Sequence, residues 1–306
     1  MGFHLKSRCY RRNFTPLKVG GTGCGKTNLT KYYAILLAGS VSGMWLFDLR
    51  KREFRFLRPI FAKMGIDLGI CRSHKFRINP LQVPDGVEPI EYAAVAADFL
   101  VRVLNLPPRA STLVNNTIMK LYTVQGVLNG SQQYPTLFHL RKAIYEDRQA
   151  NAQARMAILD TLDTVLLALG PEVLAYHRGW PVHELARQHL VFELTGLPET
   201  AKDLILNYLI SSELISRISR GISNTRMDLW ISFDEGQRLF SQHKDTSSHS
   251  GNTIIDLMGL IRGAGVGLDV SVLTTNDLSA ILPNLTSTKV IGRCGSMGES
   301  PGLAWA

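Results

Sequence analysis

The sequence predicts an α/β fold with a mainly parallel, doubly wound sheet and an inserted all-helical subdomain. Three observations carry this prediction. Short apolar strand candidates alternate with helical patterns in the first and last parts of the chain, the middle shows helical periodicity alone, and a glycine-rich turn separates the first strand from the first helix. At 306 residues, the chain is long enough for one large domain or two smaller ones.

The first part of the chain alternates strands and helices. Residues 14–19 predict a short strand, Lys26–Leu37 a helix that ends before a glycine, and residues 44–48 an apolar strand that ends on an acid. Residues 53–64 are amphipathic, and residues 66–70 form a second short apolar run. This alternation favours a parallel sheet.

The middle of the chain predicts only helices. Apolar residues recur every three or four positions in EYAAVAADFLVRVL, STLVNNTIMKLYTVQGVL, TLFHLRKAIYE and ARMAILDTLDTVLLAL, and turn signals such as LPPRA separate these segments. We therefore predict a helical insertion over residues 88–185, a core formed by residues 14–87 and 186–306, and a basic tail over residues 1–13.

Strand patterns return in the last part of the chain. The predicted order there is a strand at 190–194, a helix at 200–219, a strand within MDLWISFDE, a helix at 252–262, a strand at 268–273 and a last strand in KVIGRC. Residues 241–252, which read SQHKDTSSHSGN, are polar and predict a loop.

Composition indicates a globular protein of a reducing compartment. The sequence is 45% hydrophobic and 19% charged, and its four scattered cysteines have no zinc-like spacing, so they read as free thiols. The apolar segment at 32–47 is interrupted by GSVSG and is too short to span a membrane, and no signal-peptide pattern opens the chain. We expect a cytoplasmic location. The net charge of +9 suits a polyanionic partner such as nucleic acid or a membrane surface.

The stretch KVGGTGCGKTNLT contains a complete G-x-x-x-x-G-K-[ST] pattern, the Walker A phosphate loop. Glycines allow successive backbone N–H groups to turn toward phosphate oxygens, Lys26 would reach the β- and γ-phosphates, and Thr27 would offer its hydroxyl to Mg²⁺. The alternative is a glycine-rich turn that contains GKT by accident. The predicted nucleotide-binding residues are Gly20, Gly21, Thr22, Gly23, Cys24, Gly25, Lys26, Thr27 and Asn28.

An acidic pair follows the apolar strand LWISF, as in a Walker B segment. Asp234 would hold Mg²⁺, and Glu235 would orient and deprotonate an attacking water. Without the phosphate loop this pair would be interpreted as a solvated strand end. Its position predicts ATP hydrolysis rather than phosphoryl transfer to a small metabolite. At the next strand end, Asn276 would contact the γ-phosphate or the lytic water, or else cap the following helix.

These motifs, in this order, resemble the HerA/FtsK class of RecA-like motor ATPases. The similarity is greatest to the branch that contains HerA-type helicases or translocases and the coupling ATPases of conjugative DNA transfer, and it extends over residues 16–298. It rests on VGGTGCGKTN, FDLRKREFRFL, RINPL, VFELTGLPE and IRGAGVGLDVSVLTTNDLSAIL.

The resemblance implies a RecA-like core, ATP and Mg²⁺ as cofactors, a homo-hexameric ring and double-stranded DNA as the partner. It also implies that Arg262 acts on the nucleotide of the neighbouring subunit and that Asn276 is the sensor amide, although the family usually has Gln there. Arg50 stands where the family usually has Lys. The alternative for Arg262 is an exposed arginine at a helix end.

Little sequence precedes the phosphate loop or follows the last strand, and SRCYRRNF matches the family's leading strand poorly. We therefore expect a truncated gene product or an isolated motor domain. Three other functions stay open. They are an assembly or export ATPase of a type IV secretion system, a small P-loop kinase or transferase, and a fragment that binds ATP without motor activity. Components of a secretion or conjugation machinery are further expected partners, and such partners would recruit the cytoplasmic protein to the inner membrane.

Overall fold

One parallel sheet forms the centre of the molecule. The computed structural model describes residues 14–107, 109–222, 224–236, 261, 263–274 and 282–293. Within these ranges seven strands pair in the order β3-β4-β2-β5-β6-β1-β7, and every pairing is parallel, so the predicted sheet is confirmed. The strands are β1 (Pro16–Val19), β2 (Gly43–Asp48), β3 (Gly69–Arg72), β4 (His189–Glu193), β5 (Asn224–Phe233), β6 (Ala264–Val272) and β7 (Thr288–Ile291).

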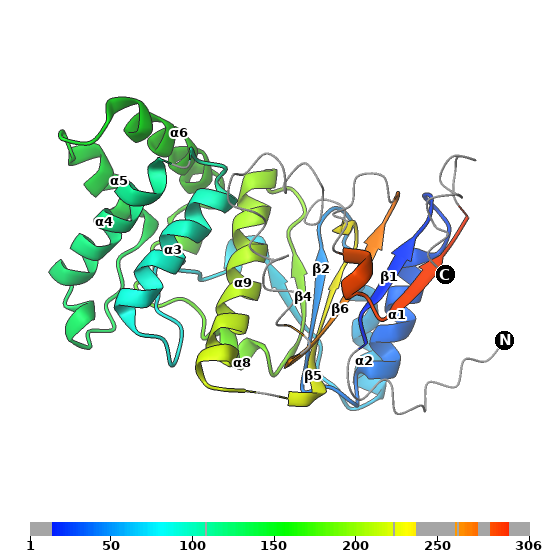
Figure 1. The fold of residues 1–306 in the computed structure, drawn as a ribbon. Coiled ribbons are helices and arrows are strands. Elements are labelled where there is room, and N and C mark those ends of the chain that lie inside the picture. Colours follow the sequence, from blue (N-terminus) through cyan, green and yellow to red (C-terminus); the bar gives the residue numbers. More distant parts are fainter. Residues whose placement is uncertain are drawn as a thin grey trace.

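Helices cover both faces of this sheet. Figure 1 shows α9 between the sheet and the group α3–α6, with α1 and α2 on the opposite side. The helices between β3 and β4 are α3 (Pro89–Val103), α4 (Ala110–Val124), α5 (Leu137–Glu146), α6 (Ala152–Leu169), α7 (Pro171–Leu174) and α8 (Val182–Leu185). The others are α1 (Lys26–Leu37), α2 (Arg58–Lys63), α9 (Glu199–Ser219) and α12 (Leu282–Leu285).

Alternating side chains of the central strands serve two hydrophobic cores. In β2, Met44 and Leu46 pack with α1 and α2, whereas Trp45 and Phe47 pack on the side of α9. The Phe47 ring stacks between Phe192 of β4 and Phe233 of β5, at centroid distances of 4.9 and 5.3 Å. Because these strands are buried on both faces, apolar residues predominate in their segments of the sequence, and side chains on both faces contribute to the cores.

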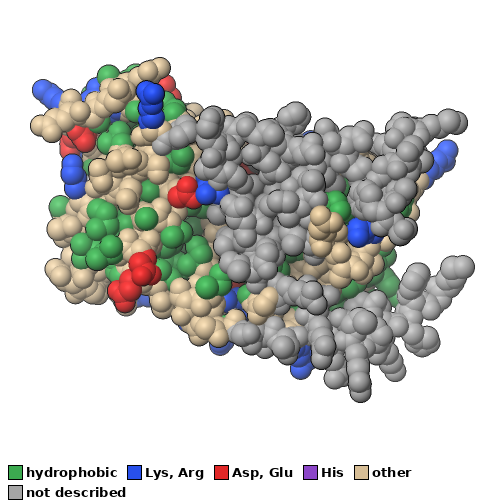
Figure 2. All heavy atoms as spheres, viewed as in Figure 1, with side chains coloured by type: hydrophobic (Ala, Val, Ile, Leu, Met, Phe, Trp, Pro, Cys, Tyr) green, Lys and Arg blue, Asp and Glu red, His purple; other side chains and the backbone are tan. Residues whose placement is uncertain are grey.

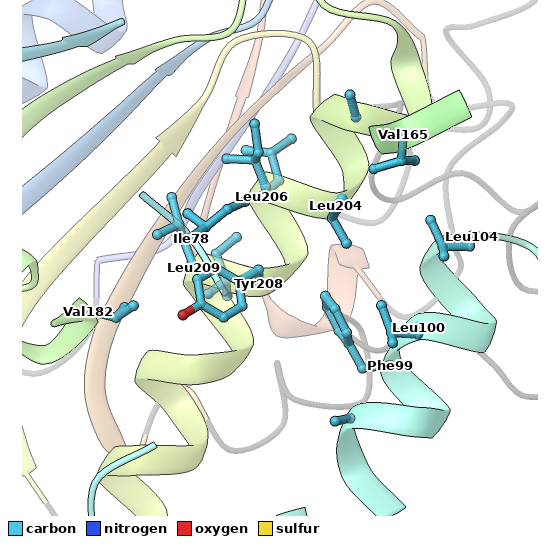
Figure 3. Packing of buried hydrophobic residues seen from close by; sticks show 14 of the residues in the cluster. Ile78, Phe99, Leu100, Leu104, Val165, Val182, Leu204, Leu206, Tyr208 and Leu209 are labelled. Carbon is cyan, nitrogen blue, oxygen red and sulfur yellow. The ribbon is translucent and has the colours of Figure 1, made fainter. Parts of the chain in front are cut away.

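The group α3–α6 packs on the sheet through α9. Phe99 and Leu100 of α3 face Leu204 and Tyr208 of α9 (Figure 3), and all four side chains are buried. These residues belong to the same hydrophobic cluster as the α9 side of the sheet. A division into domains at residues 88 and 185 therefore stays a prediction, because the helices and the sheet have one continuous core.

The two ends of this helical segment are hydrogen-bonded to each other. The backbone N–H of Trp180 donates to the carbonyl oxygen of Arg77 (2.7 Å), and a Cβ on Gly179 would lie 2.7 Å from the same oxygen. The buried Asn79 amide donates to the carbonyl oxygens of Pro135 and His177 (2.9 and 3.1 Å). Asn79, the first residue of the Asn-Pro-Leu stretch noted in the sequence, therefore links the start of the helical segment to two later parts of the same segment by hydrogen bonds.

Several strand boundaries differ from the prediction, among them the start of β5, which is Asn224 and precedes the predicted MDLWISFDE segment, and the starts of β3 and β6. The third strand begins at Gly69 rather than residue 66, because Ile66 still donates to Phe61 O (3.0 Å) and closes the end of α2. The sixth begins at Ala264 rather than residue 268, with Gly267 buried inside it. The loop predicted at 241–252 and the helix predicted at 252–262 lie outside the described residues, apart from Ile261, which is helical.

Candidate nucleotide-binding site

The predicted phosphate loop joins the carboxyl end of β1 to the start of α1. Gly23 and Gly25 adopt left-handed φ angles of 80° and 90°, and an ideal Cβ at either position would meet no atom within 4 Å. Glycine is the residue that adopts this backbone conformation at least cost. The loop thus leaves an open concave surface at the position where the pattern predicted a phosphate cradle.

Lys26, the first residue of α1, lies across this loop. Its Nζ donates to the carbonyl oxygens of Gly20 (2.5 Å) and Gly21 (2.9 Å). The first turn of α1 contains no acidic side chain, so the partial positive charge of the helix N-terminus is not compensated within the helix. The loop, the ammonium group and the helix end together suit an anion.

The structure brings Thr27 and Asp234 together from opposite ends of the sequence. Thr27 Oγ1 donates to Asp234 Oδ2 at 3.0 Å. Asp234 directly follows β5, and β5 is separated from β1 by β6 alone, so the carboxyl ends of these strands share one edge of the sheet. The two oxygens that the motifs predicted as Mg²⁺ ligands are therefore adjacent.

Glu235 has an unusual backbone and a charged partner. Its φ angle is 71°, in the left-handed region that non-glycine residues rarely adopt. Its Oε2 lies 2.8 Å from Arg50 Nε, and this contact is an ion pair. Burial raises the pKa of Glu235, as does the negative charge of Asp234, while Arg50 opposes the shift. Arg50 marked a departure in the sequence, and no pattern there indicated this contact.

These residues surround a pocket of about 410 Å³ at the carboxyl edge of the sheet. Its lining combines loop, acidic and basic groups from four segments of the chain: Thr22, Gly23, Gly25, Lys26, Thr27, Asn28, Asp48, Leu49, Arg50, Lys51, Glu53, Asp234, Glu235 and Leu273. Asp48, which ends β2, is a site residue that the sequence analysis did not assign. Burial raises its pKa to about 7, and its carboxylate accepts from Phe54 N (3.0 Å).

Two predicted site residues cannot be placed. Arg262 and Asn276 lie outside the described residues, and their roles stay predictions. Gly20, Gly21 and Cys24 are in the loop but do not line the pocket. Gly20 instead packs closely on the chain after β7, because a Cβ there would lie 3.2 Å from Gly292 Cα.

The donor set fits Mg²⁺ carried by a phosphate ligand. The described residues contain no group of three or more His, Cys, Asp or Glu side chains arranged for a metal. Mg²⁺ characteristically binds one or two protein oxygens and takes its remaining ligands from phosphate and water. The Thr27–Asp234 oxygen pair beside an open phosphate loop matches that requirement.

Two comparisons of the sequence with known proteins found no match. No family model and no curated protein matches the chain. In the part of the chain that the structure describes, no helix is long and apolar enough to cross a membrane.

The fold does resemble solved structures. VirB4 of Thermoanaerobacter pseudethanolicus matches with a TM-score of 0.67 and 16% identity, over 93% of this chain and 78% of VirB4. The unbound form of the bacterial conjugative coupling protein TrwBΔN70 gives a TM-score of 0.57 at 16% identity, over 93% and 73%. TrwB in complex with the ATP analogue ADPNP gives 0.56 at 16% identity, over 90% and 69%. The chain therefore has the RecA-like P-loop fold, as the sequence resemblance implied.

Proposed function

We propose that this protein is an ATP-hydrolysing motor of the HerA/FtsK type. The observation that carries the proposal is the contact between Thr27 and Asp234 beside the phosphate loop. It unites the two motifs that a P-loop ATPase requires, although 207 positions separate them in the sequence. The TrwB structures support ATP and Mg²⁺ as the cofactors, since one contains ADPNP and another contains ADP with Mg²⁺.

The loop and α1 would bind the triphosphate. Backbone N–H groups around Gly23 and Gly25 would donate to the phosphate oxygens, and Lys26 would exchange its carbonyl partners for the β- and γ-phosphates. Thr27 and Asp234 would hold Mg²⁺, which neutralises negative charge on the phosphates when it is bound.

Glu235 would act as the general base. Its carboxylate lines the pocket beside Asp234, and a carboxyl pKa raised by burial makes a stronger proton acceptor near neutral pH. The Arg50 guanidinium would orient this carboxylate in the absence of nucleotide. The left-handed backbone at Glu235 turns the chain sharply after the metal-binding aspartate.

We further propose that hydrolysis drives translocation of double-stranded DNA by a homo-hexamer, with Arg262 acting across the subunit boundary and Asn276 as the sensor amide. This part rests on the motif order. On the face in Figure 2, the Lys and Arg side chains of the described residues stand apart and form no single patch. We therefore assign no DNA-binding residue on that face.

The test compares the native protein with Glu235→Gln. We expect Mg²⁺-dependent ATP hydrolysis by the native protein, stimulation by double-stranded DNA, and a rate at least about a hundredfold lower in the variant with ATP binding retained. Asp67→Asn, a change in an exposed acid, is the matched control. A native protein that binds ATP without turnover, or a Glu235→Gln variant as active as native, would contradict the proposal.

A second function within the same class has its own support. The similarity to VirB4 has a higher TM-score, 0.67, than the similarity to the coupling protein TrwB, 0.57. This favours keeping the type IV secretion ATPase as an alternative to the DNA translocase. Turnover that is indifferent to double-stranded DNA would select the secretion function, and DNA-stimulated turnover would select the translocase.

A further inference from the structure

A buried ion pair lies beneath the phosphate loop, outside the pocket. Lys18 Nζ of β1 is 2.7 Å from Asp269 Oδ2 of β6, and the side chains are 1% and 0% exposed. Lys18 lies two residues before Gly20, the first glycine of the loop. The two charged residues are 251 positions apart in the sequence, and both occupy strands that are otherwise mostly apolar.

Two hydroxyl groups extend this pair toward the site. Ser232 Oγ of β5 donates to Asp269 Oδ2 (2.8 Å), and Ser232 lies two residues before Asp234. On the other side, Lys18 Nζ donates to Thr30 Oγ1 of α1. Thr30 is fully buried and donates in turn to the carbonyl oxygen of Lys26 (3.2 Å).

The network therefore connects both halves of the metal site from below. One end is the first turn of α1, which carries Lys26 and Thr27, and the other is the end of β5, which carries Asp234. No side chain of the network lines the pocket. Because side chains on one strand alternate between faces, Ser232 shares the face of β5 with Trp230, which packs with α1, and Asp234 follows directly after the strand.

Burial of this ion pair carries a desolvation cost, so a contribution to stability does not by itself explain the pair. Asp269 Oδ1 is buried and has no hydrogen-bond partner among the described residues. Burial lowers the pKa of Lys18 although Asp269 opposes that shift. Since a well-packed hydrophobic pair is often as stabilising as a buried ion pair, or more so, stability alone is a weak explanation.

We propose that Lys18 and Asp269 are positioning residues for the metal site. Through Thr30 and Ser232 they fix the distance between the Thr27 hydroxyl and the Asp234 carboxylate, so that both oxygens are in place before Mg²⁺ arrives. The proposal rests on the nucleotide-binding function of this site. Partners that orient metal ligands commonly change metal affinity by about 10- to 100-fold when they are removed.

The experiment replaces the pair as a unit. The double variant Lys18→Met/Asp269→Leu removes both charges together and leaves no unpaired buried ion. Its matched control is Arg217→Met/Glu213→Leu, which removes another buried ion pair (2.5 Å) where α9 meets β5 and β6. This control also removes the Arg217 partner of Asp228, whose side chain is 31% exposed and therefore stays in contact with water. The single variants Thr30→Val and Ser232→Ala interrupt the network without removing a charge.

The readout is binding of a fluorescent ADP analogue at a series of Mg²⁺ concentrations and in EDTA, with the melting temperature measured alongside. In Lys18→Met/Asp269→Leu, we expect the Mg²⁺ concentration for half-maximal binding to rise about tenfold, while affinity in EDTA stays within about twofold of native. Thr30→Val and Ser232→Ala should each raise the Mg²⁺ concentration for half-maximal binding by a smaller factor. The control double variant should leave this concentration unchanged.

Outcomes for this proposal and for the ATPase proposal are separable. If the network variants keep the native Mg²⁺ dependence, or if EDTA affinity falls as much as Mg²⁺ affinity, the positioning role is wrong even where ATP is hydrolysed normally. If the native protein binds nucleotide together with Mg²⁺ but does not hydrolyse ATP, the ATPase proposal fails. The Mg²⁺ titration still decides the positioning role in that case. If the native protein binds no nucleotide, both proposals are overturned.

Discussion

Arg50 and Glu235 form an ion pair in which Arg50 Nε lies 2.8 Å from Glu235 Oε2. The arginine side chain is 53% exposed and the glutamate side chain is 21% exposed, so water weakens the attraction without abolishing it. The pair connects the segment after β2 with the end of β5, across two neighbouring strands. Glu235, the proposed general base, is thus paired with Arg50. The sequence indicated Arg50 only as an arginine at a position where the family usually has lysine.

Removal of the Arg50 charge should shift the pH dependence of turnover. A neighbouring cation favours the ionised carboxylate, so Arg50→Ala raises the pKa of Glu235 further. The acid limb of the kcat–pH profile should move to higher pH, and the displacement should be modest because the pair is partly exposed to water. Arg52→Ala, an exposed arginine two residues along, is the control. A limb that stays in place or moves to lower pH would show that Glu235 does not set it.

Asp48 should make the protein less stable as the pH rises from about 5 to 7. Its pKa is raised to about 7 by burial, so in this range the folded state holds a proton that the unfolded state has released. Stability is lost as that proton is removed, and Asp48→Asn removes the titration. Relative to native, the variant should gain about 2 kcal/mol in free energy of unfolding between pH 5 and pH 7. Urea unfolding at both pH values measures the difference. If Asp48→Asn changed the free energy of unfolding equally at the two pH values, that result would be inconsistent with the raised pKa of Asp48.

Asn79→Ala should destabilise the fold substantially. The Asn79 side chain makes three hydrogen bonds, two as donor to carbonyl oxygens and one as acceptor from Leu81 N (2.9 Å). Its loss leaves buried partners unsatisfied, and we expect a decrease of about 3 kcal/mol in the free energy of unfolding. Chemical unfolding compares this variant with Asn129→Ala, a change in an exposed asparagine. An equal decrease in the free energy of unfolding in the two variants would disprove the stabilising role of the Asn79 hydrogen bonds.

Gly267→Ala should damage the sheet, whereas Gly39→Ala should be tolerated. A Cβ at position 267 would lie 2.8 Å from the Phe14 carbonyl oxygen and would collide with Met227, whereas a Cβ at Gly39 would meet nothing within 4 Å. We expect a loss of about 2–3 kcal/mol for the first variant and less than about 0.5 kcal/mol for the second. Melting temperatures rank them directly, and a Gly267→Ala variant as stable as native would overturn this explanation of the glycine.

The sheet was predictable because its strands are buried on both faces. Residues 44–48 and 190–194 are mostly apolar, with Asp48 and Glu193 as their charged residues, and they correspond to β2 and β4 within one residue at each end. The start of β6 was not predictable in the same way. Glycine normally weakens a strand, and the contacts that require Gly267 come from Phe14, Met227 and Trp230, which are distant in the sequence.

The meeting of Thr27 and Asp234 was also predictable, because each follows a strand and the carboxyl ends of parallel strands share an edge. Lys18 and Asp269 illustrate the opposite case. Each is the one charged residue of a mostly apolar segment, LKV or GLDVSVL, and nothing in either segment identifies its partner. Pairing across 251 residues depends on which strands become neighbours. The sequence motifs did not contain that information.

The hydrogen bond between Trp180 and Arg77 has a practical meaning for protein engineering. Because these two positions already meet, a short turn has the right geometry to replace the roughly hundred residues between them, or to receive a foreign module in their place. Removal of that segment would expose apolar surface on α9, because the segment buries Leu204 and Tyr208. A successful deletion would therefore carry polar substitutions at these two positions, and the remaining chain would be a minimal sheet on which the phosphate loop could be studied alone.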